Sequence, residues 1–325
     1  MAKALGTGKK TAFIIRGAAL KERGLAAAGR IAAKSGARLL CDTFAPRLQR
    51  GAGRVTVERI PYFAEQIVET LQDVEQLILV GAKPPVSFFA YPGKPSWCTP
   101  ETANIIYLSH PHEDGVAALE AVADAISAPR ESAHVAALQK PDLPKGELDQ
   151  FTAGQVIGHY LPDGAIISDE AATSGIGSAI ATATAAPHDY LSLTGGAIGQ
   201  GLPLATGAAV ACPDRKVVCI HGDGGAMYTL QALWTQAREK LDVTNVIFAN
   251  RSYAILNIEL MRVGAENPGP KALSMLDLHN PELNWVHLGQ GMGVESVRVE
   301  TVEEFTEAFA SAMKQKGPRL IEVMI

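Results

Sequence analysis

Residues 216–225 read Lys-Val-Val-Cys-Ile-His-Gly-Asp-Gly-Gly, an apolar run that stops at a glycine-rich turn. The run predicts a buried strand, and a second apolar run, residues 243–249, follows after a segment with helical spacing. Strand, helix and strand in this order are typical of a parallel sheet, in which strand ends of one kind meet at one edge. We therefore expect Asp223 and Asn250, which both follow strands, to share one crevice. Carboxylate and amide oxygens are ligands that suit magnesium.

The segment between the two strands predicts a single helix over residues 226–240. Its apolar side chains recur at helical spacing and would share one face of that helix. They are Met227, Leu230, Leu233, Trp234 and Ala237.

Strand and helix patterns alternate along the rest of the chain as well. With 325 residues, 47% hydrophobic side chains and 31 glycines, the sequence predicts two α/β domains, each a doubly wound parallel sheet with helices on both faces. The expected domains are 1–128, a central Rossmann-like domain, and 150–325. The periodicity fades in residues 129–149, where Pro129, Pro141 and Pro144 lie among charged residues, so this segment is the expected linker.

Composition excludes several classes of function. The net charge of −5 without a basic stripe argues against a nucleic-acid partner. The four cysteines form no C-x-x-C pair, which favours reduced thiols over a disulfide framework or a zinc site. No apolar run is long enough to span a membrane and the start lacks a signal sequence, so we expect a cytoplasmic protein without a membrane partner.

Gly222-Asp223-Gly224, followed one β-α-β unit later by Asn250, resembles the thiamine diphosphate motif of a known enzyme superfamily. Its members include acetolactate synthases, pyruvate decarboxylases and benzoylformate decarboxylases. The family commonly has Asn-Asn at the second anchor, where this chain has Ala249-Asn250. The resemblance implies that Asp223, Asn250 and the main-chain carbonyl of Ser252 bind Mg²⁺, and that Gly224 and Gly225 contact the diphosphate.

Further segments resemble parts of the same cofactor site. In the loop Leu193–Pro203, Ile198 matches the bulky residue that supports the bent cofactor, and Gly196 matches the residue whose carbonyl meets the aminopyrimidine. Thr173, with Ser174 in reserve, matches a hydroxyl donor to the diphosphate. A helix-initiating turn explains the glycines, and a helix cap explains Thr173, without any ligand. Four more positions match cofactor-lining residues, although core packing explains them too: Tyr228, Tyr253, Ala254 and Ile255.

The resemblance also indicates what the chain lacks. In the superfamily a glutamate on a separate pyrimidine-binding domain activates the cofactor, and this chain has no room for that domain before its first strand, so its catalytic residue is unknown. We expect the missing domain to act in trans or to belong to the N-terminal part of a longer chain, and the assembly to be a homodimer or tetramer. The chain alone is then expected to bind cofactor weakly and to turn over nothing.

The resemblance implies a decarboxylase or carboligase that acts on small 2-oxo acids, as acetolactate synthases do. Two alternatives stay open. One is a non-catalytic remnant that binds cofactor and serves as an interaction or regulatory subunit. The other is a pyruvate oxidase-like enzyme with FAD on the first domain, for which the sequence holds no recognisable fingerprint.

Overall fold

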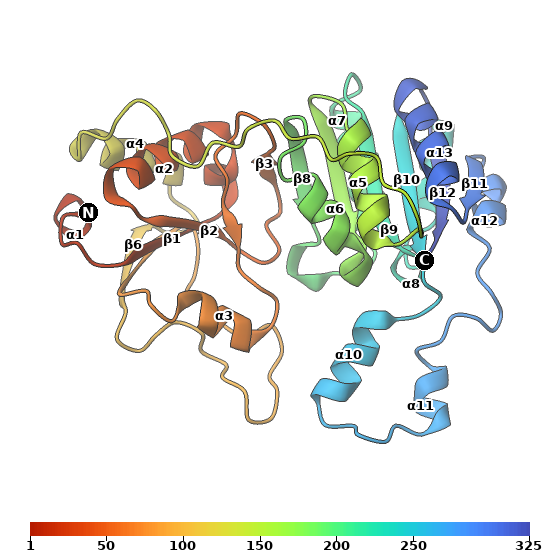
Figure 1. Ribbon diagram of the computed structural model, residues 1–325, viewed down its shortest axis with the longest axis horizontal. Helices are drawn as coiled ribbons and strands as arrows, with labels where there is room; N and C mark the ends of the chain where they lie inside the picture. The colour runs from red at the N-terminus through yellow and green to blue at the C-terminus, as the bar shows by residue number, and fades with distance from the viewer. The chain divides into compact units, whose positions relative to one another are not determined.

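The computed structural model describes residues 1–325, which divide into two compact units, Met1–Ala136 and Ala137–Ile325. The division falls inside the segment 129–149. Each unit is a parallel sheet covered by helices on both faces, so the predicted fold class is confirmed (Figure 1). None of the helices combines the length and apolar character needed to cross a membrane.

The first unit contains a five-stranded sheet in the order β4-β2-β1-β5-β6. The strands of this sheet are β1 Thr11–Ile15, β2 Arg38–Cys41, β4 Glu58–Arg59, β5 Gln76–Val80 and β6 Asn104–Ser109. The unit also contains the short strand β3 Leu48–Arg50, which is not one of these five. Its helices are α1 Ala2–Leu5, η1 Gly17–Leu20, α2 Glu22–Ser35, α3 Ala64–Leu71 and α4 Gly115–Ala125.

The second unit continues the alternation of strands and helices to the end of the chain. Its strands are β7 Ala165–Glu170, β8 His188–Ser192, β9 Val217–Gly222, β10 Val243–Ala249, β11 Glu295–Val299 and β12 Arg319–Met324. Its helices are α5 Gln150–Tyr160, η2 Ala172–Gly175, α6 Ile176–Ala181, η3 Thr194–Gly196, α7 Gly201–Ala211, α8 Asp223–Ala226, α9 Ala232–Arg238, α10 Ala254–Arg262, α11 Pro270–Ser274, α12 Trp285–Gly291 and α13 Val302–Lys314.

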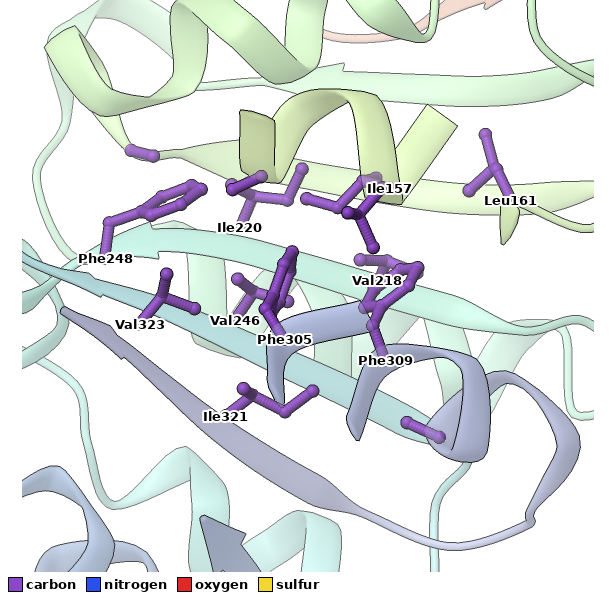
Figure 2. Close-up of a cluster of buried hydrophobic side chains, with 14 of the residues drawn as sticks. Ile157, Leu161, Val218, Ile220, Val246, Phe248, Phe305, Phe309, Ile321 and Val323 are labelled. Carbon is purple, nitrogen blue, oxygen red and sulfur yellow. The ribbon is translucent and has the colours of Figure 1, made fainter. Parts of the chain in front are cut away.

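Side chains of the second sheet alternate between two apolar cores, as expected for strands covered on both faces. Val218 and Ile220 of β9 join Phe305 and Phe309 of α13 in one core (Figure 2). The neighbouring residues of β9 face the other way, into a core that contains Trp285 of α12. Because both faces are covered, the edge at which the strands end is the place where polar side chains can meet.

All four cysteines are free, as the sequence predicts. Cys41 and Cys219 are completely buried in the sheets. Burial raises the pKa of the Cys41 thiol to about 12, so it stays protonated and packs as a small apolar residue.

The strand order of the second unit determines where a ligand can bind. Its parallel strands run β11-β12-β10-β9-β7-β8, so the chain leaves β7 for β8 on one side and then returns to β9 on the other. In doubly wound sheets, ligands bind at the carboxyl ends of the strands at such a reversal. Glu170 ends β7 and Asp223 follows β9, so both lie at this position.

The prediction of one continuous helix over residues 226–240 is wrong. The chain instead forms α8, a turn region and then α9, with Leu233 buried but Trp234 half exposed. Within the turns Thr229 N donates to Ala226 O, three residues back, and Ala232 N donates to Thr229 O. The Thr229 hydroxyl also donates to Gly199 O at 2.7 Å. This bond ties the segment between α8 and α9 to a distant loop, and apolar spacing does not reveal it.

The buried carboxylate of Glu322 on β12 gives a testable stability prediction. It is 1% exposed and accepts bonds from Arg298 Nε at 3.0 Å and from the Trp285 main chain. Replacing Arg298 with alanine leaves this charge buried without its partner, so we expect the free energy of unfolding to fall by about 2–3 kcal/mol. Urea unfolding followed by circular dichroism measures the loss.

Glu295 on the neighbouring strand offers the matched control. Its side chain is 75% exposed and pairs with Arg319, so Glu295→Ala should cost less than about 1 kcal/mol. Equal losses for the two variants would contradict the special role given to the Arg298–Glu322 pair.

Candidate functional site

Asp223 is the central residue of the candidate site. It begins α8 directly after β9 and is 3% exposed. Its Oδ1 accepts a hydrogen bond from Gly224 N, and its Oδ2 accepts one from Arg251 N, both at 2.8 Å. The second bond joins the ends of β9 and β10, so the expected convergence of these strand ends is observed.

The electrostatic environment of Asp223 favours a cation. Burial raises the pKa of this carboxyl, the two main-chain N–H donors oppose that shift, and the charge of Glu322 adds to it. Asp223 forms no ion pair with a Lys, Arg or His side chain. A bound metal ion would supply the positive charge that this buried carboxylate lacks.

Asn250, Arg251 and Ser252 form a tight turn after β10. Arg251 has a positive φ of 53°, and the side-chain oxygen of Asn250 accepts from Ser252 N at 3.0 Å. That oxygen has a second lone pair for a metal ion. The Ser252 hydroxyl accepts from Asn257 Nδ2, so it is already engaged within the chain. The structure contains no cluster of three His, Cys, Asp or Glu side chains, and the candidate set is one carboxylate with amide and main-chain oxygens.

Close packing explains the glycines that follow Asp223. A Cβ on Gly224 would lie 2.4 Å from Cε1 of Tyr253, and one on Gly225 would lie 3.1 Å from Cε1 of His221. Gly224 in particular cannot carry a side chain unless Tyr253 moves. The aromatic rings of the chain itself therefore account for glycine at these two positions.

The glycine-rich loop before α7 approaches the same region. Gly196 and Gly199 both have positive φ, at 71° and 91°. Ile198 between them is 54% exposed. A Cβ on Gly199 would lie 2.9 Å from Cβ of Tyr228, so the loop rests on the segment after α8.

The remaining predicted cofactor residues lie in η2, in the segment after α8 and at the start of α10. Thr173 is partly buried in η2, which contacts β9 and α10. Tyr228 is 60% exposed. Burial raises the pKa of Tyr253, and the charges of Tyr228 and Asp223 raise it further. Ala254 and Ile255 form the first turn of α10 and are partly buried.

One cleft of the second unit borders only part of this site. Its volume is about 530 Å³, and it is lined by Asn250 and Arg251 together with residues after β11 and β12. Ile198, Thr173 and Tyr228 do not line it. Ile198 and Tyr228 lie instead on exposed loops before α7 and after α8, and the roles of the predicted cofactor residues stay predictions.

Glu170 is a site residue that the sequence did not reveal. It is 7% exposed, and its two oxygens accept from Gly199 N and Gly201 N at 2.5 Å each. A glutamate at the end of a strand has no distinctive sequence signal. Only the register of β7 beside β9, with the folded loop, brings it to the glycines.

A buried aspartate at the reversal of a doubly wound sheet, with an asparagine at the end of the next strand and a glycine-rich loop beside it, is the arrangement in which α/β proteins of this class bind phosphate-containing ligands. Comparison with protein families specifies which one. The family model "Thiamine pyrophosphate enzyme, C-terminal TPP binding domain" matches residues 154–323, and the chain belongs to this family.

Curated relatives agree with the family. The chain is 50% identical over its full length to "Putative acetolactate synthase large subunit IlvX" of Mycobacterium tuberculosis, of which it covers 63%. It is 35% identical to a benzoylformate decarboxylase of Pseudomonas aeruginosa, over 42% of this chain and 25% of that protein. The chain thus spans less than two thirds of the length of these relatives.

Solved structures show the same fold. A thiamine diphosphate-dependent 4-hydroxybenzoylformate decarboxylase of Rhodococcus jostii RHA1 superposes with a TM-score of 0.79 at 24% identity, covering 99% of this chain and 62% of that one. The benzoylformate decarboxylase of Polynucleobacter necessarius gives a TM-score of 0.79 at 22% identity, covering 100% of this chain and 63% of that one. These likenesses support both sheets and their order along the chain.

Proposed function

We propose that this chain supplies the diphosphate and metal half of the active site of a decarboxylase or carboligase that acts on 2-oxo acids with thiamine diphosphate and Mg²⁺. The observation that carries the proposal is the buried Asp223 carboxylate, which joins the ends of β9 and β10 without a cationic side chain beside it. The names of the relatives support the reaction class, because they include acetolactate synthases and a benzoylformate decarboxylase.

The donor set fits the proposed metal. Asp223 contributes a carboxylate, Asn250 an amide oxygen and Ser252 a main-chain carbonyl, all of them hard ligands suited to Mg²⁺. So few protein ligands leave coordination positions for phosphate oxygens. Gly224 and Gly225 allow the diphosphate to approach the main chain, and Thr173 adds a hydroxyl donor.

Thiamine diphosphate, when bound, supplies the nucleophilic carbon and the electron sink for cleaving or forming a bond next to a carbonyl. The chain's own residues orient that chemistry. Ile198 and Tyr228 present apolar surface that is more than half exposed, and contact with the organic part of the cofactor would cover it. The Asp223 carboxylate would hold the metal, and the metal would hold the diphosphate end.

The other half of the site, including the group that activates the cofactor, belongs on a pyrimidine-binding domain. We propose that this domain docks in trans or precedes this segment in a longer polypeptide, within a homodimer or tetramer. Helix α10 fits such an assembly. It has no fully buried residue, although Leu256 and Met261 are large apolar side chains exposed by 44% and 66%.

Reconstitution tests the proposal. The purified chain with thiamine diphosphate and Mg²⁺ is expected to show no turnover of pyruvate or benzoylformate above the protein-free rate, because in this proposal the segment 1–325 supplies only half of the site. Adding a pyrimidine-domain chain, or joining it upstream, should restore decarboxylation or carboligation, measured as release of CO₂ and formation of the coupled product.

The control in this experiment is the same mixture with the Asp223→Ala variant, which should stay inactive. Enzyme-like turnover by the chain alone would contradict the half-site proposal. Inertness with every pyrimidine-domain partner would favour a non-catalytic interaction or regulatory subunit, and a yellow purified protein would indicate the FAD-containing alternative.

A further inference from the structure

The buried carboxylate of Glu170 has contacts that no metal or diphosphate role explains. Its Oε1 accepts from Gly199 N and its Oε2 accepts from Gly201 N, both at 2.5 Å. Hydrogen bonds to a carboxylate are stronger than neutral ones, particularly when they are shielded from water. One side chain at the end of β7 thus holds one N–H group of the glycine-rich loop and the first N–H group of α7.

The same loop is held from its opposite side. The Thr229 hydroxyl donates to Gly199 O at 2.7 Å, so both the N–H and the C=O of Gly199 are bound to other segments. Gly199 has a φ of 91°, a backbone conformation that residues other than glycine rarely adopt. The preceding residue, Ile198, is therefore exposed at a defined place.

His221 connects Glu170 to the turn that bears Asp223. It is the register partner of Glu170 on β9 and is fully buried. Its Nε2 lies 3.1 Å from Glu170 Oε2, and its Nδ1 lies 3.1 Å from Gly222 O. A Cβ on Gly201 would come within 2.7 Å of the imidazole, so the ring fills the space beside the start of α7.

We infer that Glu170 is a positioning residue that holds the glycine-rich loop, and with it Ile198, at a fixed place relative to the Asp223 turn. Its two oxygens and the adjoining imidazole link the ends of β7 and β9 to the start of α7. The role inferred for Glu170 acts through the loop and requires no contact with cofactor or metal. The inference rests on the proposed function, because the loop with Ile198 and the turn with Asp223 are the two parts of the proposed cofactor site whose spacing Glu170 would fix.

Glu170→Gln tests the inference with little change of shape. The amide can accept from one glycine N–H, but its own N–H₂ then faces the other. Hydrogen exchange in the segment 197–202 should become at least about tenfold faster, and the Kd for thiamine diphosphate with Mg²⁺ should rise about tenfold to a hundredfold. Mass spectrometry measures the first effect and titration calorimetry the second, both well below the melting temperature of each chain.

Asp189→Asn is the matched control. Asp189 is also a buried carboxylate, 3% exposed, but it pairs with Arg215 near the start of β8, at the other edge of the sheet. This variant should lower stability without changing loop exchange or cofactor affinity. Thr229→Val, which removes the other anchor, should raise both exchange and Kd by about threefold to tenfold. It provides the test if Glu170→Gln does not fold.

The outcomes separate the inference from the function on which it rests. Unchanged exchange in Glu170→Gln would overturn the anchoring role, and faster exchange with an unchanged Kd would overturn the positioning role. Failure of the unmodified chain to bind thiamine diphosphate would overturn the proposed function and the positioning of its cofactor together. Faster exchange with weaker binding, absent in Asp189→Asn, supports the inference.

Discussion

Replacing Asp223 with alanine is expected to abolish magnesium-dependent binding of thiamine diphosphate. The substitution removes the buried carboxylate and leaves no acidic replacement at the ends of β9 and β10. Loss of residues that merely support metal ligands costs about tenfold to a hundredfold in affinity, so loss of a ligand itself should exceed a hundredfold. Titration calorimetry in Mg²⁺, repeated with a chelator present, measures the effect.

Asp214 provides the control for this experiment. It is an exposed aspartate just before β9, at the opposite edge of the same sheet. Asp214→Ala should bind the cofactor as the unmodified chain does. An unchanged affinity in Asp223→Ala, with circular dichroism showing a folded protein, would remove the basis for assigning the metal site.

Part of the second sheet could be predicted from the sequence. Strand β10, Val243–Ala249, begins and ends at the residues of the predicted apolar run. All of its residues are buried, and parallel strands covered on both faces are mostly apolar for that reason. The juxtaposition of Asp223 with the turn after Asn250 follows from the same rule, since parallel strands end at one edge.

The features that escaped prediction depend on contacts between distant segments. Apolar spacing suggested one helix over 226–240, but the Thr229 hydroxyl is bound to Gly199, thirty residues earlier. Glu170 likewise acts on glycines 29 and 31 residues downstream. Periodicity reports which face of an element is buried, and it carries no information about which loop a polar side chain will reach.

Replacing Gly177 with alanine is expected to cause the largest loss of stability. Gly177 lies in α6, where a Cβ would come within 2.1 Å of Gln150 O and 2.8 Å of Phe151 Cα in α5. Gly154 of α5 approaches α6 equally closely, since its Cβ would lie 2.4 Å from the carbonyl carbon of Gly177. The obstacles are main-chain atoms, so the two helices must separate. Overpacking costs 1–3 kcal/mol and occasionally more, and we expect about 3 kcal/mol or more here.

The control for Gly177→Ala has the opposite expected sign. Gly207 in α7 is exposed, and a Cβ there meets no atom within 4 Å, so Gly207→Ala should stabilise the chain by about 0.5–1 kcal/mol. Urea unfolding of both variants measures these changes in the free energy of unfolding, and a loss below about 1 kcal/mol in Gly177→Ala would contradict the close packing of α5 on α6.

Because α6 directly continues η2, a displaced α6 should also move Thr173. Gly177→Ala is therefore expected to weaken cofactor binding as well as folding, whereas Gly207→Ala leaves binding unchanged.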